Sequence, residues 1–149
     1  MLKRLLPLLT LSLVVSGCSQ AAPVAQTSEN SDIYVVNCVT YEEKPVELVL
    51  YCADAGQILN EITWSSWTST EATGVGTSTA NDCEPSCVEG KDVISAVEIL
   101  LTKPVTSESG KRVFSQIEIQ YDKVQPSGVM DEVLDLPTIT FGDSLIGKN

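Results

Sequence analysis

Two stretches decide the fold class: DVISAVEILL at residues 92–101 and RVFSQIEIQY at residues 112–121. In the second stretch Val113, Ile117 and Ile119 alternate with polar side chains, which is a period of two. This period is typical of a β-strand with one apolar face, and a helical period fits the same residues poorly. Both stretches are therefore predicted to be strands of one antiparallel hairpin.

The loop between these strands contains Pro104 and several polar residues that favour turns. A register that places Val97 opposite Ile117, and Leu101 opposite Val113, brings the apolar positions of both strands to one face. We expect this face to be buried.

A further hairpin is predicted from residues 33–40 and 46–53, which are rich in Val, Leu, Ile and Tyr and are separated by YEEKP. If the turn centres on Pro45, Cys38 lies directly across from Cys52. Opposed residues of antiparallel strands have Cα atoms about 4.5 to 5.5 Å apart, a distance that a disulfide can bridge. The hairpin geometry therefore favours a disulfide between Cys38 and Cys52.

The other close pair is Cys83 and Cys87 in CEPSC. This spacing also occurs in metal sites and redox switches, but such a metal site needs two further Cys or His ligands, and the chain has no His. We interpret the pair as a local structural disulfide, although four cysteines allow three connectivities. A rigid loop closed by Cys83 and Cys87 would also suit a protease inhibitor.

The C-terminal part is divided into short extended pieces by Pro126, Gly128 and Pro137. We expect residues 33–149 to form one all-β domain. The predicted architecture is a small antiparallel β-sandwich or partly open barrel of about six to seven strands, with two disulfides.

The N-terminus has the pattern of an export signal, with a positive region at residues 1–4, an apolar run at residues 5–15, and then Val15-Ser16-Gly17-Cys18. The run is shorter than the about 20 residues that span a bilayer as a helix. The tetrapeptide resembles a bacterial lipobox, which implies that residues 1–17 are a lipoprotein signal peptide and that Cys18 is lipidated. The alternative is a plain secretory signal with an incidental Cys. Removing Cys18 leaves an even number of cysteines, which can pair fully in an oxidising compartment.

Residues 18–32 contain little to bury and are interpreted as the lipidated Cys18 and a flexible tether. Two or three acyl chains give stable anchoring, so we expect an extracytoplasmic protein that sits on the cell membrane without crossing it. If the organism has an outer membrane, the lipid anchor could attach the protein to that membrane instead.

Charge excludes several classes of function. The 149 residues include 20 Asp and Glu against 9 Lys and Arg. Residues 1–17 hold two of the cations and no acid, so the remainder has a net charge of -13. Because this field repels phosphate backbones, we expect no nucleic-acid partner. The absence of His removes Ser/His and Cys/His catalysis and His-ligated zinc, and no metal or cofactor is expected.

Four motifs stand in order within residues 51–90. They are Tyr51-Cys52-Ala53-Asp54-Ala55-Gly56, Trp64-Ser65-Ser66-Trp67, Ala72-Thr73-Gly74-Val75-Gly76 and Asn81-Asp82-Cys83-Glu84-Pro85-Ser86-Cys87-Val88-Glu89-Gly90. The set resembles a family of small secreted proteins and lipoproteins, mainly actinobacterial and of uncharacterised function, with CADG-like, WxxW, AxGxG and NxCxPxCxxG motifs. The resemblance implies an extracytoplasmic location and a compact β domain, and it brings no activity. Ala55 and Val88 depart from the Gly and Ala of the pattern, so those two turns differ.

The two tryptophans have two interpretations. Ala72, Gly74 and Gly76 fall on one face of a predicted strand and leave a shallow trough that Trp64 or Trp67 can fill. The indoles then belong to the core, which suits a chain with only 8 aromatic residues. The alternative makes Trp64 and Trp67 an exposed stacking platform for carbohydrate or peptide.

Two further patterns suggest chemistry. FGDSL at residues 141–145 matches the nucleophile block of GDSL-type esterases, but no His is present to activate Ser144, so no catalytic residue is assigned. Carboxylates could act as an acid/base pair or bind calcium; the candidates are Asp54, Glu61, Asp82, Glu84, Glu89 and Asp92. No calcium-loop spacing connects them, so we interpret them as a solvated acidic surface.

The leading hypothesis is a non-enzymatic, lipid-anchored extracytoplasmic β domain with an envelope-associated structural or binding role. Its expected partners are the membrane, through Cys18, and a cell-wall glycan or another envelope protein. A carboxylate-dependent glycan hydrolase and a protease-inhibitor-like module that uses the loop from Cys83 to Cys87 are the alternatives.

Overall fold

The computed structural model describes residues 32–146. The predicted signal peptide, Cys18 and all of the tether except Asp32 lie outside the described residues. Within residues 32–146 the chain forms eight strands and one short helix. In chain order these are β1 (Ile33–Asn37), β2 (Thr40–Glu42), β3 (Leu48–Val49), β4 (Gln57–Trp67), β5 (Ala72–Asn81), β6 (Asp92–Thr106), β7 (Arg112–Tyr121), β8 (Asp131–Asp135) and α1 (Phe141–Ile146).

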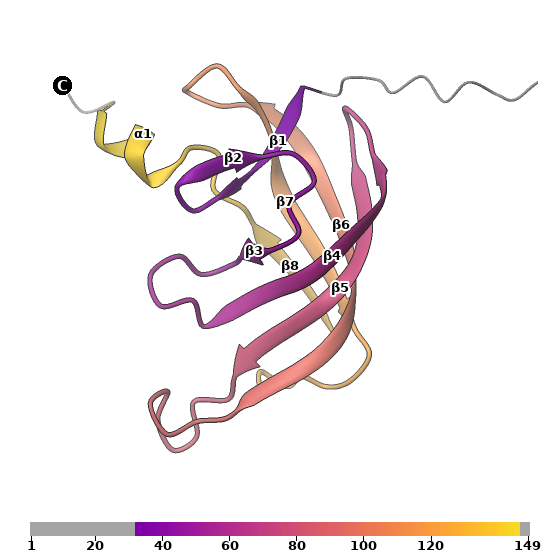
Figure 1. Ribbon diagram of the computed structural model, residues 1–149, viewed down its shortest axis with the longest axis vertical. Helices are drawn as coiled ribbons and strands as arrows, with labels where there is room; N and C mark the ends of the chain where they lie inside the picture. Colours follow the sequence, from indigo (N-terminus) through magenta and orange to yellow (C-terminus); the bar gives the residue numbers. More distant parts are fainter. Residues whose placement is uncertain (1–31, 147–149) are drawn as a thin grey trace, which may run out of the picture.

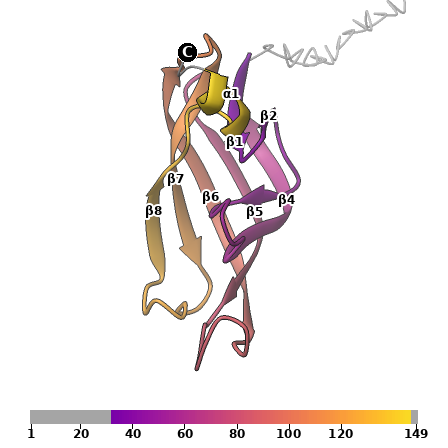
Figure 2. The same ribbon diagram turned by 90° about the vertical axis from the view of Figure 1, so that its left-hand side faces the viewer.

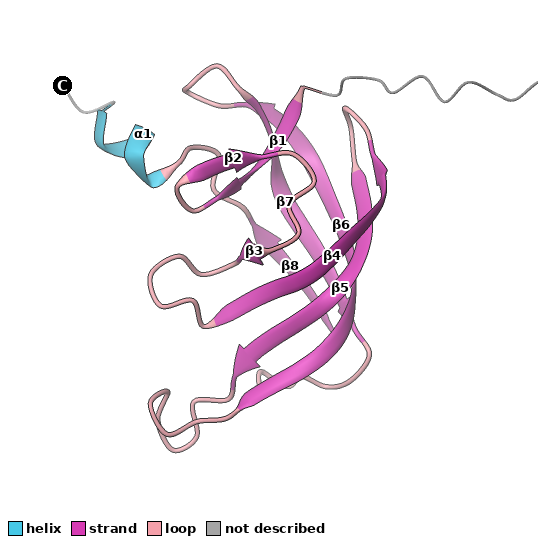
Figure 3. Cartoon of the chain, in the orientation of Figure 1, coloured by secondary structure: helices cyan, strands magenta, loops and turns pink. Residues whose placement is uncertain are grey.

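All the strands belong to one sheet that curls into a half-barrel (Figures 1 and 3). Their order is β2-β1-β7-β6-β5-β4-β3, and β8 pairs with β7. Every pairing is antiparallel except that of β1 with β7, which is parallel. The predicted all-β fold is confirmed, and of the two predicted architectures the structure has the partly open barrel.

Strands β6 and β7 form the predicted hairpin, but the predicted register is wrong by four residues. Leu101 lies opposite Ile117, and Val97 lies opposite Tyr121. Because the shift is even, the same side chains still face inward. Strand β6 also continues through Pro104, which was placed in the loop. Its pairing with β5 ends at Leu101, so Pro104 lies where β6 has no second neighbour and a missing N–H is tolerated.

The predicted pairing of residues 33–40 with 46–53 is wrong. Strand β1 pairs instead with β2, which follows a tight turn in which the Val39 N–H donates to the Asn37 carbonyl (2.6 Å). Strand β3 pairs with β4, so Leu48 lies opposite Leu59. The short β1–β2 turn at Cys38 and Val39 returns the chain before residues 46–53 can pair with β1.

The disulfide predicted from that hairpin nevertheless forms. Cys38 and Cys52 are bonded, with Cα atoms 5.5 Å apart. The Asn37 side chain links the end of β1 to β3, because its Nδ2 donates to the Glu47 carbonyl (3.0 Å) and its Oδ1 accepts from the Val49 N–H (3.1 Å). A side-chain amide therefore takes the place of the expected backbone ladder.

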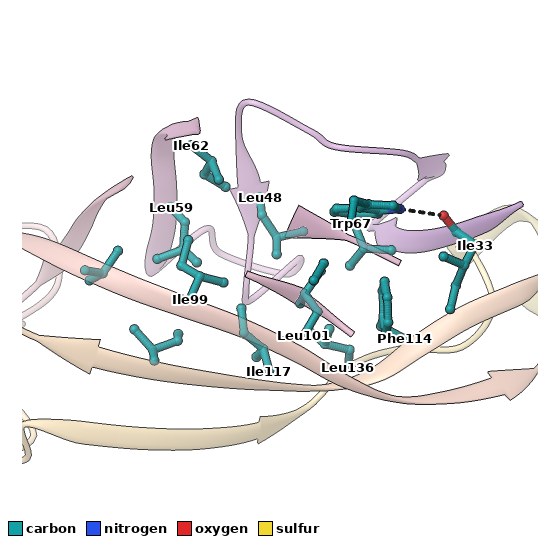
Figure 4. Packing of buried hydrophobic residues seen from close by; sticks show 14 of the residues in the cluster. Ile33, Leu48, Leu59, Ile62, Trp67, Ile99, Leu101, Phe114, Ile117 and Leu136 are labelled. Atoms are coloured by element: carbon teal, nitrogen blue, oxygen red, sulfur yellow. Dashed lines mark hydrogen bonds between the residues drawn. The ribbon is translucent and has the colours of Figure 1, made fainter. Parts of the chain in front are cut away.

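The core lies on the inner face of the curled sheet (Figure 4). Inward residues on β4 do not keep a strict period of two, because the strand has register shifts between Asn60 and Thr63 and between Trp64 and Ser66. Glu61 has a positive φ of 52° at the first shift. On a regular strand, residues three apart point to opposite faces. The irregularity between Trp64 and Ser66 instead brings Trp64 and Trp67 to the same inner face.

The two ends of the half-barrel carry different structures (Figure 2). At one end α1 lies beside β1 and β2, where the Phe141 N–H donates to the Cys38 carbonyl (2.9 Å) and the Tyr41 hydroxyl donates to Asp143 (2.6 Å). The loops at residues 82–91 and 122–130 lie at the opposite end, which we call the loop end.

Candidate functional site

Trp64 and Trp67 do not form a flat, exposed platform. Trp67 is 9% exposed, and its ring meets Trp64 at 84° with centroids 4.8 Å apart. Its indole N–H donates to the Ile33 carbonyl (3.2 Å), and that of Trp64 donates to the Pro45 carbonyl (2.8 Å). Trp64 also covers Gly74, where an added Cβ would lie 2.9 Å from the indole ring. Both rings therefore belong to the packed interior.

The loop closed by the Cys83–Cys87 disulfide is exposed but compact. The Asp82 carboxylate accepts hydrogen bonds from the N–H groups of Lys91 (2.8 Å) and Glu84 (3.1 Å), and these bonds lower its pKa. The loop has a bend at Glu84 and Pro85 and a turn over residues 87–89, whereas an inhibitor would present an extended segment to a protease. The loop is therefore neither buried nor extended, and the protease-inhibitor alternative stays a prediction.

Ser144 lies on α1, and its hydroxyl donates to the Phe141 carbonyl (2.7 Å). Of the six candidate carboxylates, Asp54 alone lines the pocket described below, whereas Asp82, Glu84 and Glu89 belong to the disulfide loop. In residues 32–146 no group of three or more His, Cys, Asp or Glu is placed to hold a metal ion. No helix in the same range is long and apolar enough to cross a membrane.

A pocket of about 340 Å³ opens near the loop end, between the loop before β4, the end of β5 and the loop before β8. Its volume lies within the range of small-ligand sites. The lining residues are Tyr51, Asp54, Gly56, Gln57, Ala80, Asn81, Tyr121, Gln125, Pro126, Ser127 and Glu132.

A chain of hydrogen bonds crosses one wall of this pocket. Gln57 Nε2 donates to the hydroxyls of Ser78 (3.2 Å) and Tyr121 (2.7 Å), and the Tyr121 hydroxyl donates to Glu132 (2.7 Å). Gln57 and Ser78 are buried, because each lies at an inward position of its strand. Near this end of the sheet, the inward positions are thus polar instead of apolar. Their hydrogen bonds, through Tyr121, orient the Glu132 carboxylate.

Gln125 supplies a second set of polar atoms from the loop at residues 122–130. The loop is held by the Gln125 N–H donating to the Val129 carbonyl (2.9 Å). The side chain is 6% exposed, and its Nε2 donates to Ser95 Oγ (2.7 Å) and to the Lys123 carbonyl (2.9 Å). Its Oε1 is buried and has no hydrogen-bond partner among the described residues. Buried acceptors without a partner are rare, so Gln125, which lines the pocket, holds an unused acceptor.

Tyr51 and Asp54 form the outer rim of the pocket, on the turn that follows β3. The Ala55 N–H donates to the Tyr51 carbonyl (2.8 Å), and Asp54 Oδ1 accepts from the Gly56 N–H (3.0 Å). The Tyr51 side chain is 44% exposed and offers its ring to solvent beside the pocket. Partial burial, and then the charges of Glu132 and Asp54, raise the pKa of Tyr51.

We expect the protein to lose stability in alkali because of Tyr121. Burial and the hydrogen bond to Glu132 raise the pKa of Tyr121 above its ordinary value of 10.0. The contribution of Tyr121 to the free energy of unfolding is therefore fully present below about pH 10. It is lost as the pH rises further, at up to about 1.4 kcal/mol per pH unit. Unfolding by urea, followed by circular dichroism at increasing pH, measures this loss.

Tyr121→Phe should flatten the alkaline fall in the free energy of unfolding. Equal slopes in the Tyr121→Phe variant and the wild-type protein would contradict the assignment.

Searches with family models, against curated proteins and against solved structures find no match to this chain. The resemblance drawn from the motifs of residues 51–90 therefore stays a prediction, as do the lipid anchor and the extracytoplasmic location.

Most of the residues that line the pocket were not predicted from the sequence to belong to a site. Gln57, Tyr121, Gln125 and Glu132 were not predicted as site residues, because they lie on β4, β7, the loop at residues 122–130 and β8, which only the fold brings together. One signal was available: Gln57 precedes Leu59 by two residues and so occupies an inward position of its strand. A polar residue that occupies an inward-facing position near the end of a strand therefore indicates such a site.

Proposed function

We propose that the chain is a lipid-anchored extracytoplasmic binding module, without enzymatic activity, that holds a hydrogen-bonding envelope ligand such as a glycan in the pocket at the loop end. The observation that carries this proposal is one pocket lined both by the hydrogen-bond chain of Gln57, Tyr121 and Glu132 and by Gln125, whose buried Oε1 has no partner among the described residues. Convergent polar groups around an exposed aromatic ring suit a polyhydroxylated ligand.

The predicted export signal and the predicted lipid anchor on Cys18 support this proposal, because both would expose the pocket to envelope ligands outside the cytoplasm. The tether ends at β1, and β1 begins at the end of the half-barrel that carries α1. The pocket lies near the loop end. An anchor at Cys18 therefore leaves the pocket free to face away from the membrane.

Calorimetric titration of the mature chain in detergent micelles tests the binding. The probes are soluble envelope glycan fragments, including oligomers of N-acetylglucosamine and of glucosamine. We expect at least one probe to bind, and Tyr51→Ala to weaken it about tenfold through loss of ring contact. Val88→Ala is the matched control, since Val88 is 96% exposed on the neighbouring disulfide loop and outside the pocket lining. No binding by any probe, or equal losses in both variants, would remove the proposal.

The glycan hydrolase alternative draws on one observation, which is that Asp54 and Glu132 line the same pocket. Chromatography of the glycan probes after long incubation with the protein separates the two functions. Unchanged probes agree with a binding module. Cleavage products that disappear in Asp54→Asn and in Glu132→Gln would instead establish the hydrolase.

A further inference from the structure

We propose that the pocket selects ligands that carry a protonated amine over neutral ligands of the same shape. This inference rests on the proposed function and specifies the chemistry of its ligand. It starts from the charges of the lining, where Asp54 and Glu132 are both acidic. Among the described residues that line the pocket, none is Lys or Arg.

The side-chain donors of Gln57, Gln125 and Tyr121 are already used within the protein. Both hydrogens of Gln57 Nε2 are directed to Ser78 and Tyr121, and both hydrogens of Gln125 Nε2 are directed to Ser95 and Lys123. The Tyr121 hydroxyl donates its hydrogen to Glu132. A ligand therefore meets few free donors on these side chains.

The acceptors, by contrast, retain capacity. A carboxylate accepts several hydrogen bonds, and Glu132 accepts one from Tyr121 while Asp54 accepts one from the Gly56 N–H. Gln125 Oε1 is an independent observation, because this acceptor is uncharged, buried and without a partner in the described part of the chain. The pocket thus combines negative charge with an acceptor that no donor in the described part of the chain uses.

A primary ammonium matches this arrangement. It is compact, carries three donors and has no acceptor. Its hydrogen bonds to carboxylates are charge-assisted and about twice as strong as neutral ones. An N-acetylated amine offers one N–H and adds a carbonyl oxygen, which would face the acceptors of the pocket. The charge at this site therefore distinguishes two ligands that share the same sugar ring.

The test compares glucosamine and N-acetylglucosamine disaccharides in calorimetric titrations of the mature chain. The pH is mildly acidic, so that the sugar amine is protonated while carboxylates are ionised. We expect the amine form to bind about tenfold more tightly. Asp54→Asn and Glu132→Gln should each reduce this preference several-fold.

The control is Glu108→Gln, which removes the same charge from an exposed residue in the loop between β6 and β7 and should keep the preference. Equal affinities, or tighter binding of the N-acetylated form, would overturn the amine inference while leaving glycan binding intact. If Glu108→Gln lowers the preference as much as Asp54→Asn and Glu132→Gln do, the preference comes from the net charge of the protein and not from the pocket, which would also overturn the inference. Binding of neither disaccharide, nor of any longer probe, would instead count against the proposed function itself.

Discussion

Replacing Trp67 by Ala should lower the free energy of unfolding by about 3 to 5 kcal/mol, which is much of the stability of an ordinary domain. Trp67 lies on β4 and donates its indole N–H to the carbonyl of Ile33 on β1. Three strands separate β4 from β1 in the sheet order. Its ring also packs edge-on against Phe114 of β7, with centroids 5.5 Å apart. Trp67 therefore joins the two sides of the curl across the interior (Figure 4).

Urea unfolding of the mature chain under non-reducing conditions, followed by circular dichroism, measures this loss without depending on tryptophan emission. Trp67→Phe keeps an aromatic ring but removes the N–H, so we expect an intermediate loss of about 1 to 3 kcal/mol. Ile94→Ala serves as the control, because Ile94 is 57% exposed, and it should change stability by about 0.5 kcal/mol or less. A loss below about 1 kcal/mol in Trp67→Ala would show that the indole does not close the core.

The second large effect is expected from the Cys38–Cys52 disulfide. Its cysteines are 14 residues apart, whereas Cys83 and Cys87 are 4 apart. Because a crosslink restricts the unfolded chain more when it closes a longer loop, the double substitution of Cys38 and Cys52 by Ser should cost about 3 kcal/mol. The same change at Cys83 and Cys87 should cost about 2 kcal/mol.

The same unfolding experiment, with free thiols counted by alkylation, compares the two variants. Cys38–Cys52 also ties the β1–β2 turn to the segment after β3, which has few backbone pairs of its own. A larger loss from the Cys83–Cys87 variant would contradict this order. So would a Cys38–Cys52 variant as stable as the wild-type protein.

The alternating residues of β6 and β7 were enough to predict an all-β fold, but they could not determine the register. A period of two is unchanged by a shift of four residues, so the predicted and observed pairings bury the same faces. The extension of β6 through Pro104 decides the register, and Pro104 was assigned to the loop because prolines usually mark turns. The local alternation of apolar and polar residues therefore identified the strands, whereas their register depends on pairing between residues far apart in the sequence.

The same distinction applies to the candidate site. The W-x-x-W spacing gave no indication that both indoles would face inward, because this depends on irregularities in β4, one of which has a positive φ at Glu61 rather than at a glycine. The pocket joins Gln57 to Glu132 through Tyr121, and only the folded sheet brings these three residues together. Asp54 was named as a candidate carboxylate, but its partners in the pocket were not.

We expect the ligand to bind in the pocket at the loop end and not on the tryptophans. Nuclear magnetic resonance of the isotope-labelled mature chain, titrated with the tightest-binding glycan probe, tests it directly. We expect shifts of the side-chain amide signals of Gln57 and Gln125, and we expect the indole N–H signals of Trp64 and Trp67 to stay unchanged. Shifts of both indole signals with unchanged Gln57 and Gln125 amides would contradict it.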